Sequence, residues 1–309
     1  MSLLINAVQL FREDKKNFLY RLLGRTCGSW MPDRLYLKIL FHLFVGKKLD
    51  FKDPQTFGEK LQWLKVYNRK PEYTTMVDKY AVKDYLGSII GEKYIIPTLG
   101  VWDNPEEIDF DTLPNQFVLK PTQGGGGSEV VICRDKASFN KNDAIMKLKA
   151  GLKQDSYRYL REWPYKNVPR RVIAEQYIED SQNPDGLQDY KFFCFDGCAK
   201  CCQVIGGRQT TMHVDFFDKD WNLLPFQEPA QYPHAKIVPT KPEGYELMWS
   251  IAETLSAGIP FVRIDLYNIK GVIYFGEITF FPTSGHGLFA PKEWNYIFGD
   301  YIKLPKNSK

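Results

Sequence analysis

The sequence lacks several features that would place it in a well-defined class of protein. Its longest apolar run, residues 39–45, is interrupted by His42 and is too short to span a bilayer. Charged residues at positions 12–16 break the N-terminal apolar stretch, so we expect no secretory signal and a cytoplasmic protein. The net charge is only +4 over 309 residues and the basic residues are scattered, which argues against nucleic-acid binding. No internal repeat is visible, so this length predicts one large unit or two to three lobes.

The six cysteines show no pattern that demands disulfides or a metal. In a reduced cytoplasmic chain, disulfides are not expected. Cys198-x-x-Cys201 has the spacing of half a zinc site, but no second pair or His-x-His partner follows at the usual distance. We therefore favour buried or idle thiols in this region, with metal binding as the alternative.

The two common nucleotide-binding loops are also absent, although glycines 124–127 are consecutive. A Walker loop needs Gly-Lys-Ser/Thr at its end, whereas here Lys120 precedes the glycines. In a Rossmann fingerprint the third glycine would fall on Glu129, and a strand follows where a helix is required. We predict a hairpin of strands 116–121 and 129–133 whose glycine-rich tip closes over phosphates through its N–H groups. The alternative is a merely mobile hairpin tip.

The first 75 residues read as a helical region. The spacing of apolar residues predicts helices at about 2–26, 34–45 and 58–67. Basic side chains interleave with the apolar stripe of the first helix, so it either rests on an anionic membrane surface or packs on the core. We favour packing on the core, because that is the usual fate of such stripes.

The rest of the chain mixes both kinds of element, which predicts an α+β fold. We expect helices at 77–86, 144–154 and 246–258, and strands at 94–99, 171–177, 188–196, 199–205 and 211–217. Aromatic residues make up 15% of the sequence. This content suits either a wide, well-packed interior or a pocket that stacks flat ligands.

The most informative stretch is a predicted hairpin of strands 261–267 and 272–280. Alternation along each strand places Arg263, Asp265 and Tyr267 on one face of the first strand, and positions 271, 273, 275, 277 and 279 together on its partner. Asp265 and Glu277 can then meet, and such a hard oxygen site suits Mg²⁺ that carries substrate phosphates. The alternative is that Arg263 simply pairs with one acid across the hairpin.

Six short motifs occur in the order seen in ATP-grasp ligases. They are Asp78-Lys79, Lys120 before the glycines, Glu175-Gln176-Tyr177-Ile178, Asp189-Tyr190-Lys191, Arg263-Ile264-Asp265 and Glu277-Ile278-Thr279. Together with the preceding Thr56–Leu64 segment, they resemble the TupA-like ATP-grasp group found with cell-surface polysaccharide genes, over about residues 50–305. The resemblance implies an ATP-grasp fold, in which two α/β lobes with antiparallel sheets grip ATP. We divide the chain into a helical region (1–75), a lobe with the phosphate lid (76–178) and a lobe with the metal site (179–309).

The same resemblance implies ATP and Mg²⁺ as cofactors and a set of residues that hold the nucleotide. Lys79 and Lys120 would contact the α- and β-phosphates. The lid over the γ-phosphate would comprise Gly124, Gly125, Gly126, Gly127 and Ser128. The adenine slot would be lined by Glu175, Gln176, Tyr177 and Ile178. The ribose would be bound by Asp180 or by its neighbour Glu179.

The remaining residues implied by the resemblance serve the metal and the chemistry. Asp265, Glu277 and Thr279 would bind the metal, although Thr279 stands where the last ligand is usually asparagine and offers less than an amide oxygen. Lys191 would face the transferred phosphoryl group, and Arg263 would steady charge on an acyl phosphate. His286 comes after these residues, in the segment where related ligases hold their acceptor. It is either a substrate contact or a plain capping or loop histidine.

The implied activity is that of an ATP-dependent carboxylate–amine ligase. Its partners would be a small-molecule or saccharide carboxylate, plausibly a uronic-acid sugar, and an amine such as an amino acid. No Ser-His-Asp or Cys-His nucleophile is apparent in the sequence, and none is required. Contact with a membrane surface or a biosynthetic complex is a further expectation.

Two rival functions stay open. Asp109-Phe110-Asp111 and Asp218-Lys219-Asp220 match the Asp-x-Asp metal motif of glycosyltransferases, although two chance matches are unsurprising among 37 acidic residues. An ATP-grasp kinase that phosphorylates a sugar hydroxyl is the other alternative.

Overall fold

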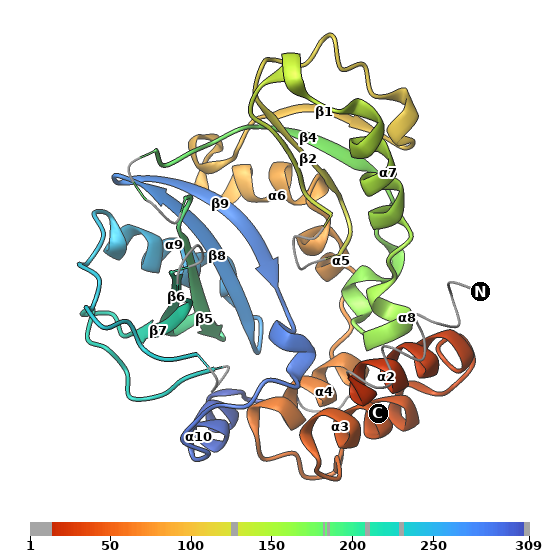
Figure 1. Cartoon of the computed structure of the whole chain (residues 1–309). Helices are drawn as coiled ribbons and strands as arrows, with labels where there is room; N and C mark the ends of the chain where they lie inside the picture. Colours follow the sequence, from red (N-terminus) through yellow and green to blue (C-terminus); the bar gives the residue numbers. More distant parts are fainter. Residues whose placement is uncertain are drawn as a thin grey trace.

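The computed structural model describes residues 14–124, 129–181, 183, 186–207, 211–228 and 232–305. The predicted lid residues Gly125, Gly126, Gly127 and Ser128 lie outside the described residues, as does the first part of the predicted N-terminal helix. Figure 1 shows two antiparallel sheets on opposite sides of the molecule, with the N-terminal helices packed beside one end of both. The α+β class is confirmed.

The smaller sheet has the strand order β1-β4-β2-β3. Its strands are β1 (Thr98–Trp102), β2 (Phe117–Pro121), β3 (Val131–Cys133) and β4 (Val172–Gln176). Alternate residues of β2 are buried, and Phe117 and Leu119 pack with α7 (Lys141–Leu152) in a core of their own. The predicted strand at 94–99 begins too early. Residues 92–94 form a 3₁₀ helix, and β1 starts at Thr98. Pro97, just before it, has no N–H group to donate to a strand ladder.

The larger sheet has the order β7-β6-β5-β8-β9. Its strands are β5 (Asp189–Phe195), β6 (Cys198–Gly206), β7 (His213–Phe217), β8 (Val262–Ile269) and β9 (Val272–Thr279). The helix α9 (Tyr245–Ser256) packs on one face of this sheet, contacting β5, β6 and β8. Much of the aromatic content lies in this interior, as in the edge-to-face pair of Phe57 and Phe261, whose ring centroids are 4.8 Å apart.

The predicted faces of the β8–β9 hairpin need one correction. Asp265 pairs with Glu277, but Leu266 pairs with Phe275, so Gly276 is an extra residue that interrupts the alternation. As a result, Ile273 and Phe275 lie in the hydrophobic core and do not share a face with Glu277.

The helices before and after the sheets are α2 (Lys15–Thr26), α3 (Asp33–Val45), α4 (Phe57–Tyr67), α5 (Glu72–Val77), α6 (Ala81–Ile90), α8 (Ser156–Leu160) and α10 (Trp294–Tyr301), with short 3₁₀ helices at η1 (Glu92–Tyr94), η2 (Pro105–Glu107), η3 (Lys136–Ser138), η4 (Trp163–Asn167) and η5 (Pro282–Gly285). The helices of the N-terminal region, α2 to α4, match the predicted ones, whereas α5, α8 and α10 were not predicted from the sequence. The helix α4 begins with a capping box between Thr56 and Glu59. A single helix at 77–86 is wrong: the chain turns at Asp78, whose carboxylate accepts hydrogen bonds from the backbone N–H groups of Tyr80 and Ala81.

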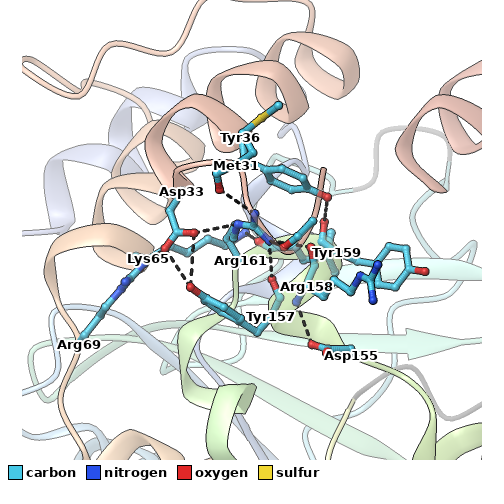
Figure 2. A network of polar contacts seen from close by, with 12 residues as sticks. Met31, Asp33, Tyr36, Lys65, Arg69, Asp155, Tyr157, Arg158, Tyr159 and Arg161 are labelled. Carbon is cyan, nitrogen blue, oxygen red and sulfur yellow. Dashed lines mark hydrogen bonds and ion pairs between the residues drawn. The ribbon is translucent and has the colours of Figure 1, made fainter. Parts of the chain in front are cut away.

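A buried polar network joins the N-terminal helices to α8 and α4, as Figure 2 shows. Its centre is Arg161, whose side chain is almost fully buried. The Arg161 guanidinium lies 2.8 Å from Asp33, donates to the carbonyls of Gly28 (2.7 Å) and Met31 (3.1 Å), and stacks 3.9 Å above the ring centroid of Tyr36. Segments about 130 residues apart in sequence are therefore fixed against one another.

Two further sequence predictions can be compared with the fold. Of the six cysteines, which are all free, only Cys198 is exposed and Cys27 is partly buried. Within the described ranges, no group of three or more His, Cys, Asp or Glu residues could hold a metal, so the zinc alternative at Cys198 and Cys201 has no support. No helix among the described residues is long and apolar enough to cross a membrane.

Candidate active site

A cavity of about 800 Å³ collects side chains from both sheets and from the N-terminal helices. Its wall contains most of the charged and hydroxyl-bearing residues that the sequence singled out. They are Lys79, Lys120, Lys191, Arg263, Asp265, Glu277 and Thr279, together with Gly124 at the base of the predicted lid. Residues up to 200 positions apart thus share one space of the size that small-molecule sites usually have.

The break between α5 and α6 brings Lys79 into this cavity. Asp78 caps α6 and forms a 2.9 Å ion pair with Arg171, while the Lys79 backbone N–H donates to the carbonyl of Thr122. The Lys79 ammonium donates to the carbonyl of Gly124, which has a left-handed backbone with φ +86°. Burial lowers the pKa of Lys79 from its ordinary value, because the charged amine is removed from bulk water.

A second lysine is held by a buried carboxylate. The two Glu175 oxygens lie 2.5 Å from Lys120 Nζ and 2.6 Å from Lys83 Nζ, and only Lys120 of these three residues lines the cavity. Burial acts to raise the pKa of Glu175, but the two ammonium groups outweigh it and hold that pKa below its ordinary value. Lys83 was not singled out from the sequence, because a lysine in an amphipathic helix normally points to solvent.

The acids and bases of the larger sheet form one compact cluster. Arg263 donates to both oxygens of Asp265 at 2.7 Å, and Lys191 Nζ lies 2.6 Å from Asp265. The same guanidinium reaches Glu277 at 3.3 Å and the Thr279 hydroxyl at 3.2 Å. The alternative that Arg263 pairs with one acid across the hairpin describes a real contact, that with Glu277, although the shorter contact is with Asp265 on its own strand.

Charge compensation keeps this cluster ionised despite its burial. Burial acts to raise the pKa of Asp265, but Arg263 and Lys191 together hold that pKa below its usual value. Burial acts to lower the pKa of Arg263, and Asp265 more than reverses the effect. The site therefore presents fixed positive and negative groups side by side to whatever enters the cavity.

Several predicted residues lie elsewhere. Gln176 ends β4, and Tyr177, Ile178 and Asp180 follow it; none of the four belongs to the part of the cavity wall that the described residues form. Glu175 turns its carboxylate to the two lysines and is likewise outside the wall. The assignment of this segment to adenine and ribose stays a prediction.

The two Asp-x-Asp motifs are also remote from the cavity. Asp111 pairs with Lys141 on the surface of the smaller sheet's layer. Asp218 accepts hydrogen bonds from the backbone N–H groups of Asp220 and Asn222, so it organises a turn. Neither motif lines the cavity, so no observation favours the glycosyltransferase alternative.

Sequence reasoning missed a second group of wall residues. It comprises Tyr20 of α2, Phe44 of α3, Leu160, Glu162 and Tyr165 around α8 and η4, and Phe281 after β9. No motif marks them, because they are ordinary members of apolar stripes and loops. Their position follows only from the packing of the N-terminal helices against α8.

The two sheets around a cavity lined by lysines and acids define a chain of the ATP-grasp class. Residues 59–303 match the family described as TupA-like ATPgrasp, and the chain belongs to this family. The resemblance drawn from the motifs is confirmed by this match. No curated protein matches the sequence.

Several solved structures resemble the chain at low identity. The D-alanine–D-alanine ligase from Helicobacter pylori is 14% identical over 81% of this chain and 69% of its own, with a TM-score of 0.45. The corresponding ligase from Bacillus anthracis complexed with ATP is 17% identical over 74% and 63%, with a TM-score of 0.42. The ATP-grasp ligase PsnB complexed with minimal precursor, Mg and ADP is 12% identical over 89% and 65%, with a TM-score of 0.37. This chain spans 63–69% of the length of these ligases, and likenesses of this strength carry no argument about substrates.

Proposed function

We propose that the protein is an ATP-dependent carboxylate–amine ligase that works through an acyl phosphate. The carboxylate would belong to a uronic-acid sugar or a related precursor of a surface polysaccharide, and the amine to an amino acid. The observation that carries the proposal is the convergence of Lys79, Lys120, Lys191 and Arg263 on one cavity with the paired carboxylates of Asp265 and Glu277. We place the reaction in the cytoplasm, where ATP is available, and contact with a membrane surface or a biosynthetic complex remains part of the proposal.

The oxygen donors of the cavity fit Mg²⁺. Asp265 and Glu277 are directly paired across β8 and β9, and the Thr279 hydroxyl lies 3.2 Å from Glu277. Carboxylate and hydroxyl oxygens are ligands that Mg²⁺ accepts, and it commonly takes only one or two carboxylates plus substrate phosphates and water. Arg263 and Lys191 already neutralise Asp265, so a cation would share this carboxylate with them. When bound, Mg²⁺ would neutralise charge on the phosphates.

The reaction needs two steps, and this chain offers groups for each. In the first step a substrate carboxylate oxygen attacks the γ-phosphorus of ATP, the bond to the β-phosphate oxygen breaks, and ADP and the acyl phosphate result. Phosphoryl transfer depends mainly on positioning and charge neutralisation, which Lys79, Lys120 and Lys191 would supply. In the second step the amine nitrogen attacks the acyl carbon, phosphate leaves, the amide forms, and the nitrogen loses its proton. Arg263 would steady the charge on the acyl phosphate as phosphate departs.

The decisive experiment incubates the full chain with ATP and Mg²⁺, a panel of sugar carboxylates and a panel of amines. Formation of ADP that depends on both co-substrates, with an amide detected by mass spectrometry, supports the ligase. A phosphorylated alcohol would support the kinase, and UDP released from a UDP-sugar without ATP would support the transferase; either result overturns the proposal.

A substitution pair ties the activity to the cavity. Lys120→Ala should abolish ATP binding or turnover while the chain stays folded, because Lys83 still balances the buried carboxylate of Glu175. Lys147→Ala is the matched control, since that lysine lies on α7 and its ammonium bonds the carbonyl of Val130 outside the charged cluster. Unchanged turnover in Lys120→Ala would refute the assignment.

A further inference from the structure

The helix α2 packs on the fold through a glycine and turns larger apolar residues outward. Of its twelve residues only Gly24 is buried, and a Cβ added there would lie 2.1 Å from the Tyr159 ring, so the contact with α8 depends on glycine. On the other side, Leu19 and Leu22 are 44% and 45% exposed. An amphipathic helix normally buries such residues against its own protein. The outward face of α2 is therefore available to an apolar medium.

The turn after α2 and the helix α3 continue this pattern. Trp30 is 67% exposed, and Leu35 and Ile39 of α3 are exposed as well. Leu35 and Ile39 are four residues apart, so they share one face of the helix. The buried Leu37 and Leu40 lie on the opposite face and pack into the fold. The segment from residue 19 to residue 39 thus exposes five large apolar side chains.

The indole of Trp30 is suited to leave water. Its N–H group donates to the carbonyl of Thr26 at 2.9 Å, in the last turn of α2. The only polar group of this side chain is therefore satisfied within the protein, and burying the ring would leave no hydrogen bond unmade. Tryptophan side chains with a satisfied N–H and an exposed ring are common where protein meets the edge of a bilayer.

The same segment carries an excess of positive charge. Between residues 14 and 48 the acids are Asp14 and Asp33, and the basic residues are Lys15, Lys16, Arg21, Arg25, Arg34, Lys38, Lys47 and Lys48. Eight basic residues and two acids give a formal charge of +6, against +4 for the whole chain, so the rest of the chain is net acidic. Asp33 is moreover paired with Arg69 and Arg161. Exposed apolar and basic side chains therefore occur together in this one part of the molecule.

We infer that this part of the chain docks on a bilayer that contains anionic phospholipids. The docking surface, here called the α2–α3 face, consists of Leu19, Leu22, Trp30, Leu35 and Ile39 with the basic side chains around them. The inference rests on the membrane contact that the proposed function includes, and it names the surface and the lipid. The apolar side chains enter the boundary between headgroups and acyl chains, while lysine and arginine side chains meet the anionic headgroups.

The charge and the apolar residues together favour lipid over other occupants. A second copy of this chain would bring two surfaces of the same charge together, which costs free energy. A nucleic acid would satisfy the positive charge, but it offers no apolar medium to leucine and isoleucine side chains. An anionic bilayer matches both properties at once.

Docking through this face would hold the cavity close to the bilayer. Tyr20 of α2 and Phe44 of α3 line the cavity, and an α-helix with its side chains is about 10 Å across. Figure 1 shows α2, α3 and α8 at the same end of the molecule. The Arg161 network fixes this end to the rest of the fold (Figure 2), so contact with lipid would orient the whole chain.

The test measures co-sedimentation of the full chain with vesicles of phosphatidylcholine alone and of an equimolar mixture with phosphatidylglycerol. We expect binding to the mixed vesicles that weakens as NaCl is raised, and little binding to phosphatidylcholine. Leu22→Ser and Trp30→Ser should each weaken binding by about tenfold, because each removes an apolar group from the bilayer boundary. Lys38→Gln should weaken it by about fivefold.

Two substitutions elsewhere on the surface serve as matched controls. Leu247→Ser changes a leucine of α9 that is as exposed as Leu22, at 45%. Lys153→Gln changes an exposed lysine at the end of α7. Both should bind the mixed vesicles as the wild type does. Thermal unfolding of every variant shows that the comparison is made between folded proteins.

The outcomes separate this inference from the ligase activity. Absence of binding to mixed vesicles, equal binding to phosphatidylcholine, or wild-type binding in both Leu22→Ser and Trp30→Ser would each overturn the docking surface. Tighter binding of a single-stranded RNA than of vesicles, or a dimer that the same substitutions dissociate, would assign the face to another occupant and overturn it too. If mixed vesicles bind through this face but no ADP forms with soluble co-substrates, the surface stands and the ligase falls. If ADP and amide form but no vesicles bind, the ligase stands and the surface falls.

Discussion

Glu175 and Lys120 form a buried ion pair at 2.5 Å in which the second carboxylate oxygen is held by Lys83. A single acid thus fixes one lysine of the cavity wall and one lysine behind it. The Lys120 side chain lines the cavity, whereas its partner Glu175 is buried, with 5% of its surface exposed. The buried acid, rather than the lysine, is therefore the more sensitive point for substitution.

Glu175→Gln should destabilise the fold and weaken nucleotide binding together. The amide leaves two buried ammonium groups without a counter-charge, which costs about 3–5 kcal/mol of unfolding free energy. Denaturant unfolding and ADP titration measure the two effects. Glu106→Gln is the control, because that acid pairs with Lys149 at the surface, where water screens the pair, and its loss should leave stability close to that of the wild type. Wild-type ADP affinity in Glu175→Gln would show that Lys120 does not depend on Glu175.

The two carboxylates of the larger sheet should respond differently to the loss of their charge. Glu277→Gln should leave stability within about 1 kcal/mol of the wild type, because the Glu277 side chain is 36% exposed. Asp265→Asn should cost about 3 kcal/mol, because it leaves two buried cations with only their longer ion pairs, Arg263 with Glu277 and Lys191 with Asp189, each at 3.3 Å. Both should reduce ATP turnover by about 100-fold or more if they hold Mg²⁺. A Glu277→Gln enzyme with normal turnover at low Mg²⁺ would contradict the metal role.

Local patterns were sufficient to predict most strands and the first helices, whereas the lysines of the site came from the resemblance to ATP-grasp ligases. Strands with alternating burial, such as β2, and periodic helices, such as α4, were visible because they depend on neighbours in sequence. The spacing of Asp265 and Glu277 also sufficed to place them opposite one another. These features share one cause: the physical determinant lies within a few residues of the position it controls.

The features that were missed depend on partners distant in sequence. The bulge at Gly276 follows from the close approach of the Asp265 carbonyl, since a Cβ added at Gly276 would lie 2.9 Å from it. The break at Asp78 depends on its side chain capping α6 and on Arg171. Tyr20 carries no signal that distinguishes it from its neighbours, because the pattern of a helix shows which face is apolar but not what that face meets.

The neutral imidazole of His286 predicts a specific loss of stability in acid. Burial lowers its pKa to about 3 in the folded chain, against about 6.5 when unfolded, so the unfolded state binds the extra proton between these values. The contribution of His286 to the free energy of unfolding is therefore fully present above pH 6.5. It decreases as the pH drops toward 3, by at most about 1.4 kcal/mol per pH unit. His286→Phe, which can still stack on Phe44, should unfold with a shallower acid dependence. His42→Asn, at an exposed position, should leave the dependence unchanged, and equal slopes in all three proteins would refute the prediction.

Arg161→Lys should detach the N-terminal helices although the charge is kept. The guanidinium donates to two carbonyls of the 28–31 segment, pairs with Asp33 and covers Tyr36, and a lysine ammonium cannot make this set of contacts. We expect a loss of about 3–5 kcal/mol of unfolding free energy, because the change leaves Asp33 and several carbonyls poorly satisfied in a buried place. Hydrogen exchange should accelerate in α2 and α3 well before the strands of the two sheets respond. Arg170→Lys is the matched control, since Arg170 is about half exposed and pairs with Asp155 at 3.3 Å. Uniform acceleration of exchange over the whole chain would show instead that the Arg161 network stabilises the entire fold and not the N-terminal wall of the cavity.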